Sequence, residues 1–289
     1  MKDDHRRYLQ KGEQAGGRFV LAAPRRAPLG VGGAHLSNRA GASLEFRDHR
    51  EYQPGDDLRR IDWSAYARTD RLIVKLYQEE VSPHLDIVID GSRSMALEET
   101  AKLEATLGLA AVFSVAAANA GFSRSAWLAR EGCQKVEGSA GAPSSWETAA
   151  FDFSGDLFES FSRTRPRWRC QGMRVLLSDL LWPGDPLLAL QYLARDAAAV
   201  VVVQVLAAAD REPALRGNTR LVDSETGEAR EIFIDATSVA RYHEALDRHQ
   251  QNWSRACRQA GAVMTTLPAE ATVEEWKLEE LVAAEILRG

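Results

Sequence analysis

Three short runs of almost continuous apolar residues limit the folds that this chain can adopt. They are LDIVID at residues 85–90, RVLLSD at 174–179 and AVVVVQVL at 199–206, and segments with helical spacing lie between them. Strands that are buried on both faces of a parallel sheet have this composition, because helices cover each face. We therefore predict an α/β fold, a doubly wound and mostly parallel sheet with helices on both faces.

The chain divides by composition into three parts. Residues 1–35 are polar and then rich in Gly, Pro and Arg, which predicts a flexible or extended N-terminal arm. Residues 36–80 are charged and aromatic and end in LIVKLYQEE, which favours an edge strand packed on the main domain. Residues 81–289 contain no internal repeat and no linker, so we expect them to form a single domain.

The segment between Glu45 and Arg71 interleaves charged and aromatic residues around a Pro-Gly turn at residues 53–56. Arginines contact carboxylates through two hydrogen bonds at once, and the aromatic side chains need burial. We therefore predict an ordered polar loop rather than a solvated run of charges. The arginines are Arg47, Arg50, Arg59, Arg60 and Arg68, the acids are Glu45, Asp56, Asp57 and Asp62, and the apolar residues are Phe46, Tyr52, Ile61, Trp63 and Tyr66.

Charge and cysteine content exclude several classes of protein. The formal net charge is −5 and the pI is near 5.8, which disfavours a surface built for nucleic acid, although the arginine pairs at 25–26 and 59–60 are local basic sites. Cys133, Cys170 and Cys257 are odd in number and widely spaced, so we expect neither a disulfide framework nor a zinc site. We read no signal peptide and no membrane anchor, and we expect a cytoplasmic protein without membrane insertion.

Two of the apolar runs end in aspartate, at Asp90 and Asp179. Ligands of doubly wound sheets bind beyond the carboxyl ends of the strands, so both carboxylates are expected at the same edge. Ser92 and Ser94 follow Asp90 on a tight turn and add two hydroxyl oxygens. This all-oxygen set suits Mg²⁺, with Mn²⁺ as a substitute, better than zinc. We call these four residues the strand-end site.

The same residues allow other interpretations. Ser92 or Ser94 can cap the following helix while Asp90 binds loop amides. Arg93 places a positive charge beside the site and weakens cation binding unless it points away. An aspartyl-phosphatase reading requires an acid in the position of Ser92, and no serine-hydrolase elbow, zinc-protease motif or phosphate-binding loop is present. The glycines at 30, 32 and 33 lack the spacing and the strand context of a dinucleotide site.

Two stretches resemble known families. The Asp-x-Ser-x-Ser spacing after a buried strand resembles the metal-ion-dependent adhesion site of the von Willebrand factor A fold. The block EF-x3-REYQPGDDLRRIDW-x3-AR-x2-RLIVK, from Glu45 to Lys75, resembles the characteristic block of domain-of-unknown-function family 58. The resemblance implies a von Willebrand factor A-like domain in which a loop threonine, here Thr148 or Thr164, supplies a further ligand. It also implies MoxR-type AAA+ ATPases as partners, because members of the family are usually encoded beside them.

We therefore expect a non-enzymatic protein-interaction module that works with a MoxR-type AAA+ ATPase in the assembly or maturation of client proteins. The divalent cation at the strand-end site would connect the module to an acidic group of its partner. The block from Glu45 to Lys75 would be either a second docking surface or a brace for the site. The alternative from another class is a metal-assisted hydrolase at the same strand ends.

Overall fold

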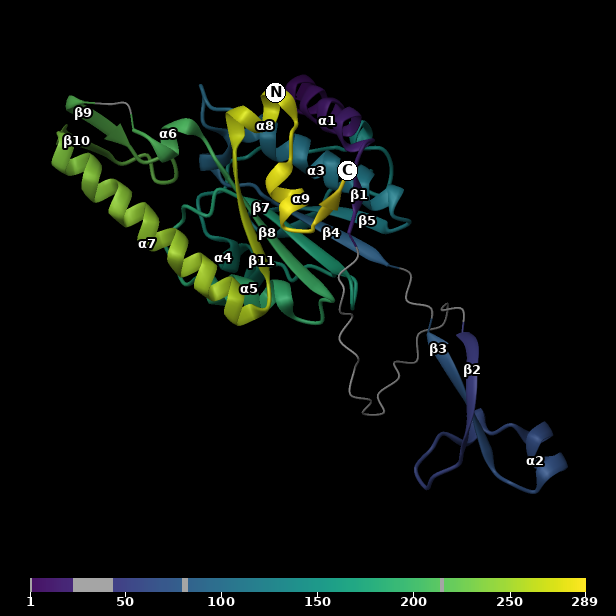
Figure 1. Ribbon diagram of the computed structural model, residues 1–289. Helices are drawn as coiled ribbons and strands as arrows, with labels where there is room; N and C mark the ends of the chain where they lie inside the picture. Colours follow the sequence, from purple (N-terminus) through teal and green to yellow (C-terminus); the bar gives the residue numbers. More distant parts are fainter. Residues whose placement is uncertain (1, 23–43, 80–82, 214–215) are drawn as a thin grey trace. The chain divides into compact units, whose positions relative to one another are not determined.

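The computed structural model describes residues 2–22, 44–79, 83–213 and 216–289 (Figure 1). It contains two compact units. Unit 1 comprises Met1–Pro28 and Pro83–Gly289, and unit 2 comprises Leu29–Ser82. The glycines at 30, 32 and 33 and the expected arm at 23–35 lie outside the described residues.

A six-stranded sheet forms the centre of unit 1, with the strand order β11-β8-β7-β4-β5-β6. Neighbouring strands from β11 to β5 are parallel, and only the pair β5–β6 is antiparallel. The strands are β4 (His84–Asp90), β5 (Ser123–Ala129), β6 (Cys133–Lys135), β7 (Met173–Ser178), β8 (Ala199–Leu206) and β11 (Val263–Pro268). The predicted mostly parallel sheet is therefore confirmed.

Helices cover both faces of this sheet, as expected for a doubly wound fold (Figure 1). Along β4, Ile87 and Ile89 belong to one buried cluster and Val88 to the other, because successive strand residues point to opposite faces. The first cluster includes residues of α1 (Lys2–Gly16), α3 (Lys102–Asn119), α8 (Ala269–Glu275) and α9 (Glu279–Ala283). The second includes residues of α4 (Leu157–Arg163), α5 (Pro186–Ala194) and α7 (Ala236–Ala260). Among the described helices, none is both long enough and apolar enough to cross a bilayer.

The first helix corrects the prediction of an extended arm at the start of the chain. Residues 2–16 form α1, which packs on α3 through a buried stripe of His5, Leu9, Gly12 and Gly16. A Cβ atom on Gly12 would lie 2.0 Å from the carbonyl oxygen of Gly108, so the two helices touch backbone to backbone. The helical stripe escaped prediction because two of its four members are glycines and only one is a typical core residue.

Two further segments are helical only in part. Helix α4 occupies only the last part of the segment 146–161, because residues 146–156 instead run past the strand ends and Phe153 forms a bridge with Ser92. Near the end of the chain, α8 and α9 are separated at Trp276, which has a left-handed backbone conformation. There the indole packs against Gly108. The chain then ends in β12 (Leu287–Arg288), which pairs with β1 (Val20–Leu21).

A hairpin of β9 (Gly217–Val222) and β10 (Ala229–Ile234) forms a separate two-stranded sheet between α6 (Ala208–Arg211) and α7. Side chains on both of its faces are exposed: Leu221 and Ile232 lie on one face, and Val222 and Phe233 on the other. The hairpin therefore buries little apolar surface of its own. Short 3₁₀ helices complete unit 1 at η2 (Arg93–Ala96) and η3 (Pro143–Ser145).

Unit 2 is an antiparallel pair of β2 (Leu44–Glu51) and β3 (Ile73–Glu79), whose connection carries η1 (Leu58–Arg60) and α2 (Trp63–Thr69). The strand predicted from LIVKLYQEE is thus present, and it pairs with β2. The predicted polar loop is ordered: Arg50 Nη2 donates to Asp56 Oδ1 at 2.8 Å. Ile61 is buried as expected, whereas the Trp63 side chain is 61% exposed, contrary to the expectation. The side chains of Glu45, Phe46, Arg47 and Arg60 lie outside the described ones.

Asp62 holds the connection of unit 2 together. Its Oδ1 caps α2 by accepting hydrogen bonds from the backbone amides of Ser64 and Ala65, both at 3.0 Å. Its Oδ2 lies 3.0 Å from His49 Nε2 and 3.4 Å from Lys75 Nζ. These groups favour the ionised carboxylate, and the amide of Ala65 is the largest cause that lowers the pKa of Asp62 to about 2.

We predict that Asp62 stabilises unit 2 in a pH-dependent way. Because its pKa is lowered in the folded state, its contribution is complete above about pH 4 and disappears as the pH falls towards 2. The amide proton shifts of Ser64 and Ala65 in NMR spectra should follow this titration, with a midpoint near 2. A midpoint at 3.8 or above would contradict the capping role. Asp57→Asn, in the same connection, should leave both titration curves unchanged.

We also predict that Cys170 is the one thiol that reacts rapidly in the folded protein. Cys170 is exposed, whereas Cys133 and Cys257 are buried. Burial raises the pKa of both buried thiols, that of Cys257 to about 12, so their reactive thiolates are scarce at pH 8. Ellman's reagent should titrate one thiol in buffer and three in denaturant. Rapid titration of two or more thiols without denaturant would contradict the buried positions.

Candidate functional site

The parallel pairing of β4 with β7 brings Asp90 and Asp179 to the same end of the sheet, as predicted. Asp90 is the last residue of β4, and Asp179 directly follows β7. Both carboxylates are buried, at 2% and 1% exposure. The strand-end site therefore forms where two neighbouring strands end, and both acids lie in surroundings that exclude most of the solvent.

The turn after β4 places both serine hydroxyls next to Asp90. Asp90 Oδ1 accepts a hydrogen bond from the amide of Ser92 at 3.0 Å, and Asp90 Oδ2 accepts one from Ser178 Oγ at 2.5 Å. The Ser92 and Ser94 hydroxyl oxygens lie 3.1 Å apart. Ser92 precedes η2 without a side-chain capping hydrogen bond, so the capping alternative does not apply to it. The other part of that alternative, Asp90 binding a loop amide, is present.

Burial gives Asp90 an unusual affinity for protons. It is the main cause that raises the pKa of Asp90 to about 6, and the negative charge of Asp179 acts in the same direction. The hydrogen bonds from Ser178 and Ser92 offset part of this rise. The carboxylate is therefore largely ionised at pH 7, and it is held in that state at a cost to stability.

Lys102 forms a buried ion pair with Asp179, the second acid of the site. Its ammonium group is fully buried at the first turn of α3, 3.0 Å from Asp179 Oδ2 and 3.1 Å from Asp210 Oδ2. Burial opposes the charge on Lys102, but the two carboxylates outweigh it and raise the pKa of the ammonium group. We did not predict this role. The available signal was a lysine at the start of an otherwise apolar helix, where the helix dipole disfavours a cation.

Glu225, at the tip of the β9–β10 hairpin, adds a third carboxylate that we also did not predict. Its Oε1 accepts a hydrogen bond from the amide of Ser94 at 3.0 Å. Burial raises the pKa of Glu225, the contacts with Ser94 offset part of that rise, and the charge of Asp179 adds to it. No signal in the sequence connects this hairpin with Ser94, which lies far away along the chain.

Arg93 points away from the serine hydroxyls. Its Nε donates to the carbonyl oxygen of Asp152 at 3.1 Å, and its Nη1 donates to the carbonyl oxygen of Glu225 at 3.5 Å. The guanidinium group is thus engaged by the backbone around the site. These two bonds direct the positive charge towards backbone carbonyl oxygens and reduce its repulsion of a cation at the serine hydroxyls.

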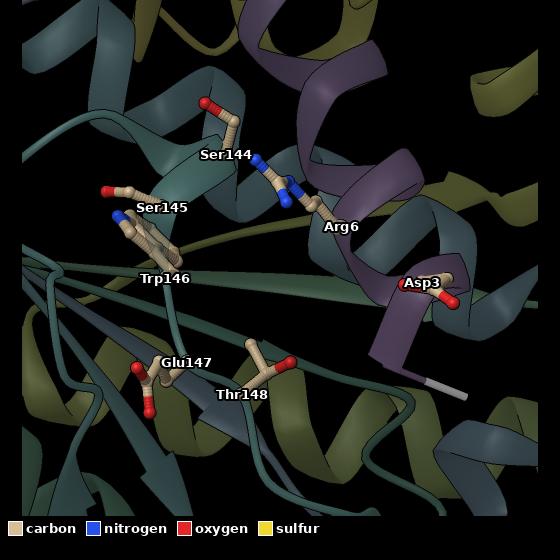
Figure 2. Close-up of a pocket in the computed structure, with 7 residues that line it drawn as sticks. All are labelled: Asp3, Arg6, Ser144, Ser145, Trp146, Glu147 and Thr148. Atoms are coloured by element: carbon tan, nitrogen blue, oxygen red, sulfur yellow. The ribbon is translucent and has the colours of Figure 1, made fainter.

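The two threonines considered as further ligands have their contacts elsewhere. Thr148 Oγ1 lies 2.9 Å from His5 Nδ1 and lines a pocket together with Asp3 and Arg6 of α1 (Figure 2). Thr164 ends α4 and packs against Gly132. Within the described part of the chain, no three side chains of His, Cys, Asp or Glu converge to hold a metal ion. A cation at the strand ends would therefore depend on the serine hydroxyls.

We predict that Lys102→Met destabilises unit 1 strongly. The substitution keeps most of the side-chain volume but leaves Asp179 and Asp210 buried without their cation, a loss that typically costs about 3–5 kcal/mol. Urea denaturation followed by circular dichroism should show this decrease in the free energy of unfolding. Lys135→Met, at an exposed position of β6, is the matched control and should change it by less than about 0.5 kcal/mol. Equal effects of the two substitutions would contradict the role of the buried ion pairs.

This chain is similar to several mycobacterial proteins. Uncharacterized protein Mb1516 of Mycobacterium bovis is 28% identical over 247 residues, which cover 81% of this chain and 78% of that protein. Uncharacterized protein MAV169 of Mycobacterium avium is 35% identical over 116 residues, which cover 39% of this chain and 66% of that protein.

Among solved structures, the conserved hypothetical protein BatB from Bacteroides thetaiotaomicron matches 70% of this chain and 98% of its own, with 11% identity and a TM-score of 0.35. At that TM-score the match adds nothing to the description of the fold. The family model described as "Protein of unknown function DUF58" matches residues 48–252. Because this match covers more than half of the sequence and includes the strand-end site, the chain belongs to the DUF58 family.

Proposed function

We propose that the protein is a non-enzymatic interaction module of the von Willebrand factor A type. In this proposal the strand-end site holds Mg²⁺, or Mn²⁺ as a substitute, and the cation connects the module to a carboxylate of a partner protein. The parallel sheet with helices on both faces supports the fold type. The Asp-x-Ser-x-Ser turn at the carboxyl end of β4 supports the site.

The spacing of the two serine hydroxyls is the observation that carries the proposal. Neighbouring ligands of an octahedral Mg²⁺, with bonds of about 2.0–2.1 Å, lie about 2.9 Å apart. The hydroxyl oxygens of Ser92 and Ser94 are 3.1 Å apart beside the Asp90 carboxylate, so these three groups fit a hard cation. Asp179 contributes negative charge next to them, although its Oδ2 is engaged by Lys102. The bound cation would supply a Lewis-acidic position for an incoming carboxylate.

The partner in this proposal is a MoxR-type AAA+ ATPase, with which the module would assist the assembly or maturation of client proteins. The expectation of this partner was based on the resemblance of the block from Glu45 to Lys75 to the DUF58 family. Membership of that family supports the choice. Unit 2 would supply a second docking surface, since Leu58 and Trp63 are exposed on it.

We predict that Asp90→Asn weakens cation binding strongly without unfolding the protein. Isothermal titration calorimetry should show one saturable Mg²⁺ site in the unsubstituted protein, and an affinity lowered at least about tenfold in the variant. The melting temperature should not fall, because burial and the charge of Asp179 both disfavour the ionised Asp90 carboxylate, and a neutral side chain removes both costs. Asp152→Asn, an exposed aspartate paired with Arg130, is the matched control and should bind Mg²⁺ normally.

The same variants test the partner. A MoxR-type ATPase from the same genome should be retained by the immobilised protein in Mg²⁺, and it should be lost in a chelator or on Asp90→Asn. The cation-bridged interaction would be contradicted if calorimetry showed no heat of Mg²⁺ binding. It would also be contradicted if the ATPase were retained equally with the chelator and by the Asp90→Asn variant. Hydrolysis of a phosphoester that disappears on Asp90→Asn would instead support the metal-assisted hydrolase.

A further inference from the structure

The tip of the β9–β10 hairpin is built to present Glu225 to the strand-end site. Asp223 Oδ1 accepts hydrogen bonds from the amides of Glu225 at 2.8 Å and Thr226 at 2.9 Å, which closes a tight turn. Gly227 follows with a φ of +74°, a conformation that glycine adopts without strain. The turn thus fixes the direction in which Glu225 leaves the hairpin.

The Glu225 carboxylate is bound at one oxygen only. Oε1 accepts the hydrogen bond from Ser94, whereas Oε2 is buried and has no hydrogen-bond partner among the described residues. A buried oxygen of an acid without a donor is unfavourable, more so near a second acid such as Asp179. The position becomes favourable once a cation lies next to the serine hydroxyls, because Oε2 is then available as a ligand.

We propose that Glu225 is an internal ligand of the strand-end site and takes the place at which a partner's carboxylate binds. The inference rests on the proposed function, because it names what competes with the partner at the same site. In the closed state the hairpin tip covers the site through Ser94, Arg93 and the cation. A partner's acidic side chain displaces Glu225, and the hairpin tip moves away.

The hairpin tip can move away from the site at a small cost in free energy. Among the described strands, its two strands pair with each other alone, and most of its side chains are exposed, on both faces. A two-stranded hairpin that buries so little apolar surface is held weakly, so the contacts at its tip decide its position. The exchange replaces one carboxylate by another, and the net change in charge at the site is therefore small.

The test uses Glu225→Ala and a fluorescein-labelled hexaglutamate peptide as the probe, with Mg²⁺ or with a chelator. If the closed state holds about nine-tenths of the molecules, removing the internal carboxylate should tighten peptide binding about tenfold, and only with Mg²⁺. Glu228→Gln is the matched control, because Glu228 lies in the same turn but is exposed and faces Arg230. It should bind the peptide as the unsubstituted protein does.

Two further measurements distinguish a failure of the internal-ligand proposal from a failure of the proposed function. Asp223→Ala keeps the Glu225 carboxylate but loosens the turn that presents it, so it should tighten peptide binding by a smaller factor. In the unsubstituted protein, saturating peptide should speed hydrogen exchange at the amides of Ser94, Glu225 and Thr226. Unchanged or weaker peptide binding by Glu225→Ala, with Mg²⁺ binding intact, would overturn the internal ligand and leave the proposed function standing. Absence of Mg²⁺ binding in every variant would overturn both.

Discussion

Two carboxylates buried side by side at the end of the central sheet are the constraint on which much of unit 1 depends. Parallel pairing of β4 and β7 makes Asp90 and Asp179 neighbours, and burial strengthens their repulsion. Lys102, at the start of α3, compensates the charge of Asp179 through a buried ion pair, and it forms a second ion pair with Asp210 of α6. Ser178 and the Ser92 amide bind the other acid. One network of charged groups thus connects the ends of β4 and β7 with the start of α3 and with α6, which follows β8.

Part of this arrangement could be predicted from the sequence, because it follows from local patterns. Apolar runs that end in Asp90 and Asp179 predict parallel strands, and parallel strands place their ends at one edge. Lys102 and Glu225 could not be found in this way, since each reaches the site from a separate element. Their positions depend on how α3 and the β9–β10 hairpin pack, and residue spacing carries no information about that packing.

The prediction at the start of the chain was wrong for a different physical reason. Helix α1 packs through glycines, where the close approach of two backbones replaces the apolar side chains that a periodicity analysis detects. In unit 2, by contrast, the charges that suggested an ordered loop were informative. Asp62 joins a helix cap, His49 and Lys75 in one network, so a polar segment becomes structured with little apolar core.

The pairing of β1 with β12 has a consequence for biosynthesis. These strands lie near opposite ends of the chain, and unit 2 is inserted between β1 and β4 of unit 1. Helix α1 leaves the ribosome early, yet its packing surface on α3 and the partner of β1 are synthesised later. Contacts between such distant segments form slowly, because a long loop must close first. The nascent chain therefore exposes Leu9 until α3 has been synthesised, and Leu21 until β12 has been synthesised.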